Sequence, residues 1–200
     1  MIRQQDRIHG LTKEILGDRY IHLEVLHCQF QEDFRGEDSL LACRVRTAEG
    51  ETTIEGHGVG IVDAFFKGLL IRLSKDYPSL KTVSIDKFTV QAKASSGRQS
   101  SMADSLAVVT VGMSNSVGRH FEFQHESRSV TRSSIEATLL AVEYFVNSEC
   151  AFIECFRAMK SAKEQRRQDL VERYTSLMSE LVKNTSYSEV IEQIREEMQQ

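Results

Sequence analysis

Residues 39–74, SLLACRVRTAEGETTIEGHGVGIVDAFFKGLLIRLS, decide the fold. Two apolar runs separated by a turn at residues 48–50 predict a β-hairpin over residues 40–54. Apolar residues then recur at helical spacing over residues 61–73, which predicts a helix. Upstream, residues 20–30 alternate polar and apolar side chains and predict a further strand. The region is therefore a unit of three strands followed by a helix.

The same order of elements recurs after Pro78, the only proline in the chain. A helix is predicted to follow strands at residues 87–94, 105–113 and 119–125. Individual residues also align, SLLACRV with SLAVVTV and VDAFFKGLL with IEATLLAVE. We therefore predict an α+β fold, an internally duplicated βββα unit with repeats at about 20–77 and 80–147. One unit cannot bury all of its apolar surface, so two units should pack together or pair in a dimer.

The two ends of the chain differ from the repeats. Residues 1–19 are predicted to form a helical lead-in, and residues 148–200 a helical extension. The polar and mostly basic residues 157–169 predict a solvated stretch of helix or a bend. Ser186 and Glu189 match a capping box that would open a final short helix.

The extension also carries an apolar stripe. It indicates oligomerisation or the docking of a partner rather than packing on the chain's own domain. The stripe consists of Leu170, Tyr174, Leu177 and Leu181, with Val171, Met178 and Val182 beside them.

Composition excludes several classes of protein. With 25 basic and 29 acidic residues the net charge is −4, which does not favour nucleic acid as a partner. Apolar runs fall short of the roughly 20 residues that span a membrane. The first ten residues show no apolar core of a secretory signal, so we expect a cytoplasmic protein. The four cysteines follow no metal-binding spacing, and we expect reduced core thiols, no metal and no cofactor.

The glycine-rich segment EGHGVGIVDAFF, residues 55–66, is the most distinctive local feature. Backbone amides and the helix dipole at such a turn favour an anion, either a phosphate or a carboxylate. The spacing is not a dinucleotide fingerprint, because Asp63 stands where that motif needs glycine, and no GK[ST] of a phosphate-binding loop follows. Alternatively, the glycines make a tight strand-to-helix turn and Asp63 caps the helix.

No catalytic constellation is visible in the sequence. The six histidines are scattered, and only His57 lies near a plausible ligand. The polar residues 95–104 predict a solvated loop. An enzyme that uses a cleft between the repeats would have only His57 or His125 beside Asp63 to offer.

Several of these motifs together resemble the C-terminal regulatory (allosteric dimerisation) domain of the 2-isopropylmalate synthase and citramalate synthase family. Residues 58–64, GVGIVDA, match the family's G-N/D-G-P-V-D-A, residues 118–121, GRHF, match the close of its second repeat, and residues 133–137, SSIEA, begin the following helix. The resemblance covers about residues 20–147.

The resemblance implies a homodimer that holds leucine or isoleucine between two regulatory domains near the glycine turns. It implies ligand-binding roles for Gly58, Val59, Gly60, Ile61, Asp63 and Ala64, and we add Asp104, Gln124 and His125 of the second repeat as candidate ligand-binding residues. In the second repeat, Phe123, Gln124 and His125 stand where the family has its G-V-G turn.

The family's catalytic barrel and its metal ligands are absent from this sequence, so we expect a chain that is not an enzyme. Two hypotheses follow. In the first, the chain is a stand-alone regulatory module that binds a branched-chain amino acid or a keto acid and acts on a separate synthase-type chain. In the second, it is a structural or interaction protein that keeps the fold for dimerisation, has lost the site, and docks a partner through its C-terminal helices.

Overall fold

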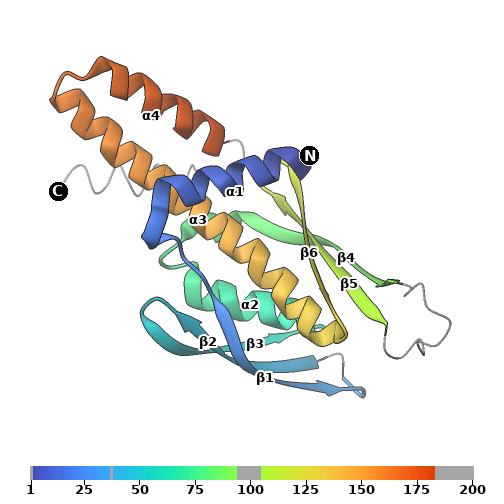
Figure 1. Cartoon of the computed structure of the whole chain (residues 1–200). Coiled ribbons are helices and arrows are strands. Elements are labelled where there is room, and N and C mark those ends of the chain that lie inside the picture. Colours follow the sequence, from blue (N-terminus) through green and yellow to red (C-terminus); the bar gives the residue numbers. More distant parts are fainter. Residues whose placement is uncertain (1, 37, 94–104, 183–200) are drawn as a thin grey trace.

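The computed structural model describes residues 2–36, 38–93 and 105–182, and these residues form two three-stranded antiparallel sheets with long helices (Figure 1). The first sheet contains β1 (Glu24–Asp33), β2 (Asp38–Thr47) and β3 (Gly50–Gly58), and the second contains β4 (Val83–Lys93), β5 (Leu106–Asn115) and β6 (His120–Ser127). The helices are α1 (Ile2–Leu16), α2 (Ile61–Leu73), α3 (Val130–Glu164) and α4 (Gln168–Leu181). Short 3-10 helices at Gly17–Arg19 and Pro78–Thr82 complete the order. The predicted duplicated α+β fold is confirmed.

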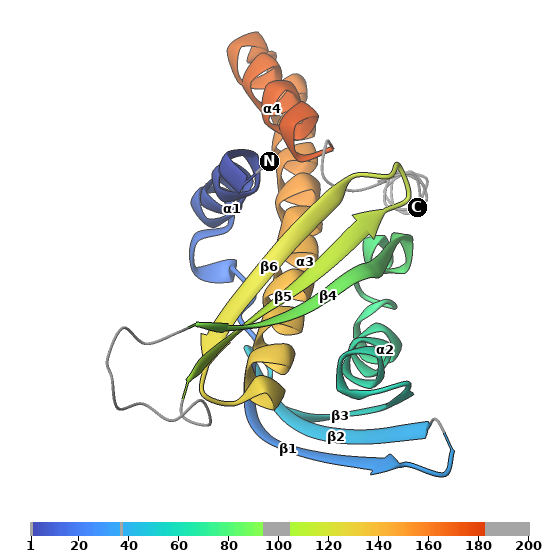
Figure 2. The same cartoon turned by 90° about the vertical axis from the view of Figure 1, so that its right-hand side faces the viewer.

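Each sheet is covered by the helix that follows it. The helix α2 packs on β2 and β3, α3 packs on β5 and β6, and the two helices contact each other (Figure 2). Their apolar faces and the facing strands form one core, in which Phe65, Leu69, Val109, Val111 and Phe145 are fully buried. The two repeats therefore share a single hydrophobic core.

The first strand begins later than the sequence predicts. The segment before β1 extends along α3, and side chains of α3 form hydrogen bonds with the backbone of this segment. The Ile21 amide donates to Asn147 Oδ1 (2.7 Å), Asn147 Nδ2 donates to the Ile21 carbonyl (2.8 Å), and the Leu23 amide donates to Glu143 Oε1 (2.6 Å). Because these groups bond to a helix, residues 20–23 do not join the sheet, and β1 starts at Glu24.

The C-terminal helices form a hairpin on the chain itself. The helix α3 ends at Glu164, Arg166 adopts a left-handed conformation (φ 57°), and α4 folds back along α3 (Figure 1). The bend predicted within residues 157–169 is confirmed. Against the expectation that the apolar stripe meets a partner, Tyr174, Leu177, Met178 and Leu181 pack on the chain's own core. Ser186 and Glu189 lie outside the described residues.

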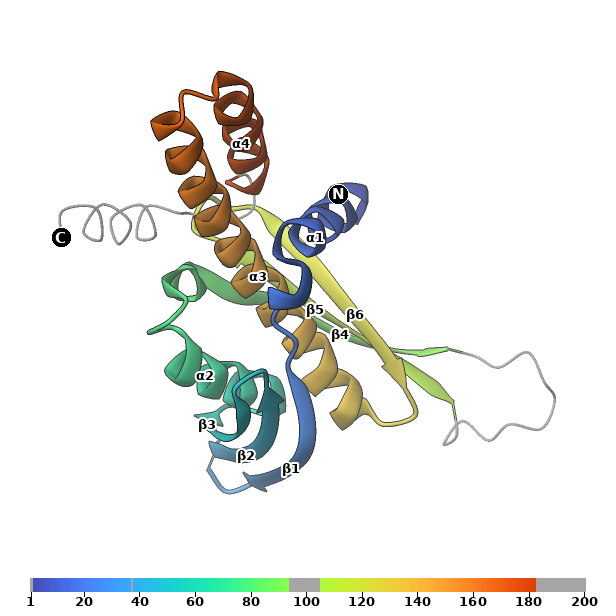
Figure 3. The same cartoon turned by 60° about the vertical axis from the view of Figure 1, so that its left-hand side comes forward.

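The lead-in helix α1 packs across α3 (Figure 3). Its Ile8 and Leu16 are buried, and Arg7 reaches Glu180 of α4 at 2.6 Å. Thus α1, α3 and α4 form a helical layer at one end of the molecule. No helix in the described part of the chain has both the length and the apolar character required to cross a membrane.

The cysteines correct another prediction. Cys28 on β1 lies opposite Cys43 on β2 in the strand register, and the two are joined by a disulfide. The prediction of reduced thiols is therefore wrong for this pair, because strand pairing brings together residues whose spacing in sequence carries no signal. Cys150 and Cys155 on α3 are free, and burial raises the pKa of the two thiols to about 12 and about 11.

Candidate functional site

The glycine turn between β3 and α2 allows the helix to approach the strand closely. A Cβ at Gly56 would overlap the Ala64 carbonyl, and one at Gly58 would lie 2.6 Å from the Ala64 amide. Gly60 has a φ of 82°, a backbone conformation that residues with a Cβ rarely adopt. The glycines at 56, 58 and 60 are therefore required by the backbone path and by packing.

Donors of this turn are already used within the chain. The Val59 amide donates to Asp63 Oδ2 and the Gly60 amide to Ser39 Oγ, both at 2.9 Å. Lys67 Nζ lies 2.7 Å from Asp63 Oδ2. Burial opposes ionisation of Asp63, but hydrogen bonds from Lys67 and the Val59 amide outweigh it and hold the pKa of this carboxyl below its ordinary value. Asp63 therefore stabilises the turn by accepting the Val59 amide, but it does not cap the helix as the structural alternative predicts, because the N-cap is Gly60 and has no side-chain cap.

The second strand-to-helix turn does not lie where the resemblance suggested. Phe123, Gln124 and His125 are inside β6, and Phe123 is buried in the core. The connection to α3 is instead formed by residues 128–129, where Ser129 Oγ accepts the Arg132 amide at 3.2 Å. The alignment of Val62 with Ile135 does not support a turn at residues 123–125 either, because it places the counterpart of residues 58–60 at residues 131–133, inside α3.

The predicted site residues therefore fall in separate places. Six of the predicted residues lie within residues 58–64, which run from the end of β3 into the first turn of α2. By contrast, Gln124 is exposed on β6, and His125 Nδ1 lies 3.3 Å from Ser133 Oγ. Among the described residues, no hydrogen bond or ion pair joins Gln124 or His125 to the turn. Asp104 and the predicted loop at residues 95–104 lie outside the described residues.

An apolar strip on β4 is a feature that sequence reasoning missed. Phe88 pairs with Val111 and Val90 with Val109, so both side chains lie on the helix-facing side of the sheet. Val109 and Val111 are fully buried, whereas Phe88 is 46% exposed and Val90 45% exposed. The reason is that α3 packs mainly on β5 and β6, so that only the start of β4, where Val83 is buried, joins the core. We call Phe88 and Val90 the β4 strip.

A polar network occupies the opposite face of the same sheet. His120 Nδ1 lies 2.8 Å from Asp86 Oδ2, and its Nε2 lies 3.3 Å from Glu122 Oε1, which also pairs with Lys87 at 2.7 Å. Ser114 donates to Asp86 as well. Hydrogen bonding to Asp86 outweighs burial and raises the pKa of His120 above its ordinary value of 6.5.

These groups do not assemble into a metal centre. No set of three or more His, Cys, Asp or Glu side chains placed to hold a metal ion occurs within residues 2–36, 38–93 and 105–182. His57 is exposed on the outward face of β3, where it pairs in register with Leu40. It therefore points away from the core that the two repeats share.

The fold and these surfaces define an internally duplicated βββα domain whose second sheet leaves an apolar edge uncovered. The sequence matches the family described as the LeuA allosteric (dimerisation) domain over residues 4–146, and the chain belongs to this family. The match extends from α1 into α3 and includes both repeats. It confirms the resemblance to the regulatory domain of the isopropylmalate synthase family. No curated protein matches the sequence.

Proposed function

We propose that this chain is a non-catalytic, dimer-forming regulatory module that binds a small ligand resembling a branched-chain amino acid. The family supports the regulatory and dimerising part of this function. The observation that carries the proposal is the β4 strip, because these two large apolar side chains lie on the helix-facing surface of the sheet and remain about half exposed to solvent among the described residues. A second copy of the chain would remove them from water.

The test for dimerisation is a charge placed on the strip. Val90→Glu or Phe88→Glu puts a carboxylate where the partner would bury an apolar side chain, so we expect the variant to become monomeric in light scattering. Gln91→Glu is the matched control, since Gln91 is exposed on the other face of the same strand. A folded Val90→Glu protein with the mass of a dimer would contradict this interface.

One observation favours the alternative hypothesis, that the chain is a structural or interaction protein without a ligand site. At the first turn, the Val59 and Gly60 amides are bonded to Asp63 and Ser39, so a ligand carboxylate would have to replace these partners. Calorimetric titration with leucine, isoleucine, valine and 2-isopropylmalate separates the two hypotheses. A heat of binding with any of these compounds supports the regulatory module. The absence of any heat of binding to a folded dimer supports a purely structural role.

The proposal extends to a separate synthase-type catalytic chain as the target of regulation, in the cytoplasm. Addition of the module to such a synthase, with and without the ligand, should change the activity of the synthase. An activity unaffected by the module at saturating ligand would count against this partner.

A further inference from the structure

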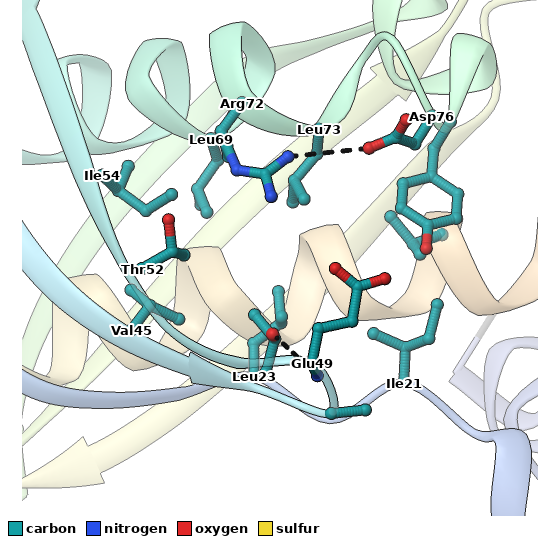
Figure 4. Close-up of a pocket in the computed structure, with 14 residues that line it drawn as sticks. Ile21, Leu23, Val45, Glu49, Thr52, Ile54, Leu69, Arg72, Leu73 and Asp76 are labelled. Atoms are coloured by element: carbon teal, nitrogen blue, oxygen red, sulfur yellow. Dashed lines mark hydrogen bonds and ion pairs between the residues drawn. The ribbon is translucent and has the colours of Figure 1, made fainter.

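A groove lies between α1, α3 and α4, in the helical layer at one end of the molecule (Figure 1). Its volume is about 290 Å³, whereas the cavity beside the last turn of α2 measures only about 90 Å³ (Figure 4). The helices α1 and α4 both pack on α3, and the ion pair between Arg7 and Glu180 joins them near one end. Away from this pair, part of the surface of α3 stays open between the two helices.

The groove is lined mainly by apolar side chains that are not fully buried. They come from both walls and are Leu11 and Ile15 of α1 and Tyr174 and Leu177 of α4. On the floor, the small side chain of Ala158 of α3 leaves room between the walls. An amphipathic helix binds to such a groove by inserting the apolar side chains of one face.

Most of this groove belongs to the C-terminal extension. The family matches residues 4–146, whereas the floor, at residues 154–158, and the α4 wall follow that range. The groove is also separate from the glycine turn and from the β4 strip, because none of their residues lines it. An occupant of this groove is therefore a feature of the extension rather than of the family.

The groove carries opposite charges on its two walls. Of its four charged lining residues, Arg19 and Glu154 pair with each other at 2.7 Å. The other two, Glu14 of α1 and Arg173 of α4, are exposed and form no ion pair with any residue that the structure describes. An occupant that fits the groove should therefore present an apolar face with a basic group on the side of α1 and an acidic group on the side of α4.

Residues 186–198, SYSEVIEQIREEM, have this pattern. At about 3.6 residues per turn, several apolar residues fall on one face of a helix. They are Tyr187, Val190, Ile191, Ile194 and Met198. Arg195 and Glu197 fall on opposite flanks of this face. The apolar face and its two charged flanks therefore match the groove and its two walls.

We propose that the groove binds residues 186–198 of the same chain as an amphipathic helix. The apolar face inserts between α1 and α4, Arg195 pairs with Glu14, and Glu197 pairs with Arg173. Residues 183–185 span at most about 10 Å, which lets the segment turn back along α4. A helix of this length is marginal in water by itself, so it gains stability from the groove, and the tether holds it at an effective concentration on the order of millimolar. This inference does not depend on the proposed function.

Fluorescence of the full chain tests this assignment, because the chain contains no tryptophan. In Ile194→Trp the indole lies on the apolar face, so we expect it to be protected from quenching by acrylamide. In Gln193→Trp the indole lies on the polar face and should be accessible to acrylamide. Equal accessibility in the two folded proteins would overturn the proposal.

Substitutions in the groove show whether the indole is buried there. Ala158→Glu places a carboxylate and extra volume on the floor, so it should remove the protection seen in Ile194→Trp. The matched control is Ser179→Glu, which adds the same group to an exposed residue of α4 that does not line the groove and should leave the protection unchanged. Protection that survives Ala158→Glu in a folded protein would count against the groove as the place of binding.

Two further measurements keep the test decisive. The protection should persist when Val90→Glu removes the proposed dimer interface, and its loss there would show that the segment fills the groove of a second copy, contrary to the proposal. A labelled peptide of residues 186–198 should bind to the full chain carrying Ile191→Glu, whose own segment fits poorly, more tightly than to the wild type, whose groove is filled. Absence of peptide binding to the Ile191→Glu chain would contradict the proposal even if Ala158→Glu does not fold.

Discussion

Three glycines at the contact between α2 and β3 serve packing rather than flexibility. A Cβ at Gly68 would lie 2.8 Å from the Glu55 carbonyl and 2.9 Å from Ile54 Cγ2. Gly56 and Gly58 face the same contact from the strand side. By contrast, Gly10 lies inside α1 with no atom within 4 Å of the position of a Cβ. Substitution by alanine should therefore have opposite effects on the free energy of unfolding at Gly68 and at Gly10.

We expect Gly68→Ala to lower the free energy of unfolding by about 1–3 kcal/mol, because the strand and helix backbones must move apart. Gly10→Ala should raise it by up to about 1 kcal/mol, since alanine has the higher helix propensity. Urea denaturation of the two variants measures both effects. A stabilised Gly68→Ala protein would show that the close helix–strand contact is not present in solution.

The His120 network makes stability depend on pH. Hydrogen bonding to Asp86 raises the pKa of His120 in the folded state above 6.5, so its contribution is complete below pH 6.5 and is lost as pH rises through the folded pKa. Hydrogen bonds that outweigh burial lower the pKa of Asp86 below 3.8, and a hydrogen bond from Lys87 lowers that of Glu122 below 4.5. Their contributions are present above those values and are lost as pH falls through the folded pKa.

The network should therefore stabilise the protein most between about pH 4.5 and about pH 6.5. We expect the wild type to lose more stability than His120→Gln between about pH 6 and about pH 8.5. Denaturation curves of the two proteins at both pH values give this difference. Equal losses would exclude a role of His120 in the pH dependence, and His57→Gln, which alters an exposed histidine, is the control.

At the scale of elements, α3 organises the rest of the chain through buried polar groups. Asn147 and Glu143 bond to the backbone of Ile21 and Leu23, and Glu149 Oε2 accepts the Ser79 amide at 3.0 Å. These contacts fix the segment before the first repeat and the link between the two repeats. Burial, opposed by the Leu23 amide and His22, raises the pKa of Glu143.

Asn147→Ala should lower the free energy of unfolding by about 2–4 kcal/mol, because it leaves the Ile21 amide and carbonyl without partners. Ser148→Ala is the matched control, since the Ser148 hydroxyl bonds within its own helix to the Tyr144 carbonyl. Denaturation measures both values, and hydrogen exchange at Ile21 should accelerate only in Asn147→Ala. Equal effects of the two substitutions would mean that α3 does not hold this segment.

The disulfide between β1 and β2 closes a loop of 15 residues. Chain entropy predicts that its reduction lowers stability by about 3 kcal/mol. Unfolding in the presence and absence of a reductant measures this loss, and Cys28→Ser should be insensitive to the reductant. A count of four free thiols in the denatured, unreduced protein would show that the bond does not form under the conditions of purification.

At the scale of the whole molecule, the two repeats share their core unequally. The helices α2 and α3 contribute one buried side each to the interior, and α3 packs on β5 and β6. Val83 at the start of β4 is buried, whereas the β4 strip stays about half exposed. This asymmetry gives a monomer with one sheet edge that gains from association.

If two copies pair through this strip, the melting temperature should rise with protein concentration, because association stabilises only the folded state. The Val90→Glu variant should melt at a temperature that is independent of concentration. Scanning calorimetry over a hundredfold range of concentration, on the order of 1 to 100 μM, tests both expectations. A concentration-independent wild-type value would contradict a dimer that dissociates on unfolding.

The order of the strands and helices, the duplication and the limits of α2 can all be predicted from the amino-acid sequence. These features follow from local signals, namely the period of apolar residues, the glycine turn and the hairpin at residues 48–50. The tight strand-to-helix turn was also open to prediction, because its glycines lie within one short segment, whereas the prediction that Asp63 caps the helix was wrong, since the N-cap is Gly60.

The exposed surfaces and the contact partners of these elements depend on tertiary packing. The start of β1, the Cys28–Cys43 pair, the docking of α4 and the exposure of the β4 strip all depend on segments far apart in sequence. Periodicity shows that a residue has an apolar side, but only packing shows whether another part of the chain covers it.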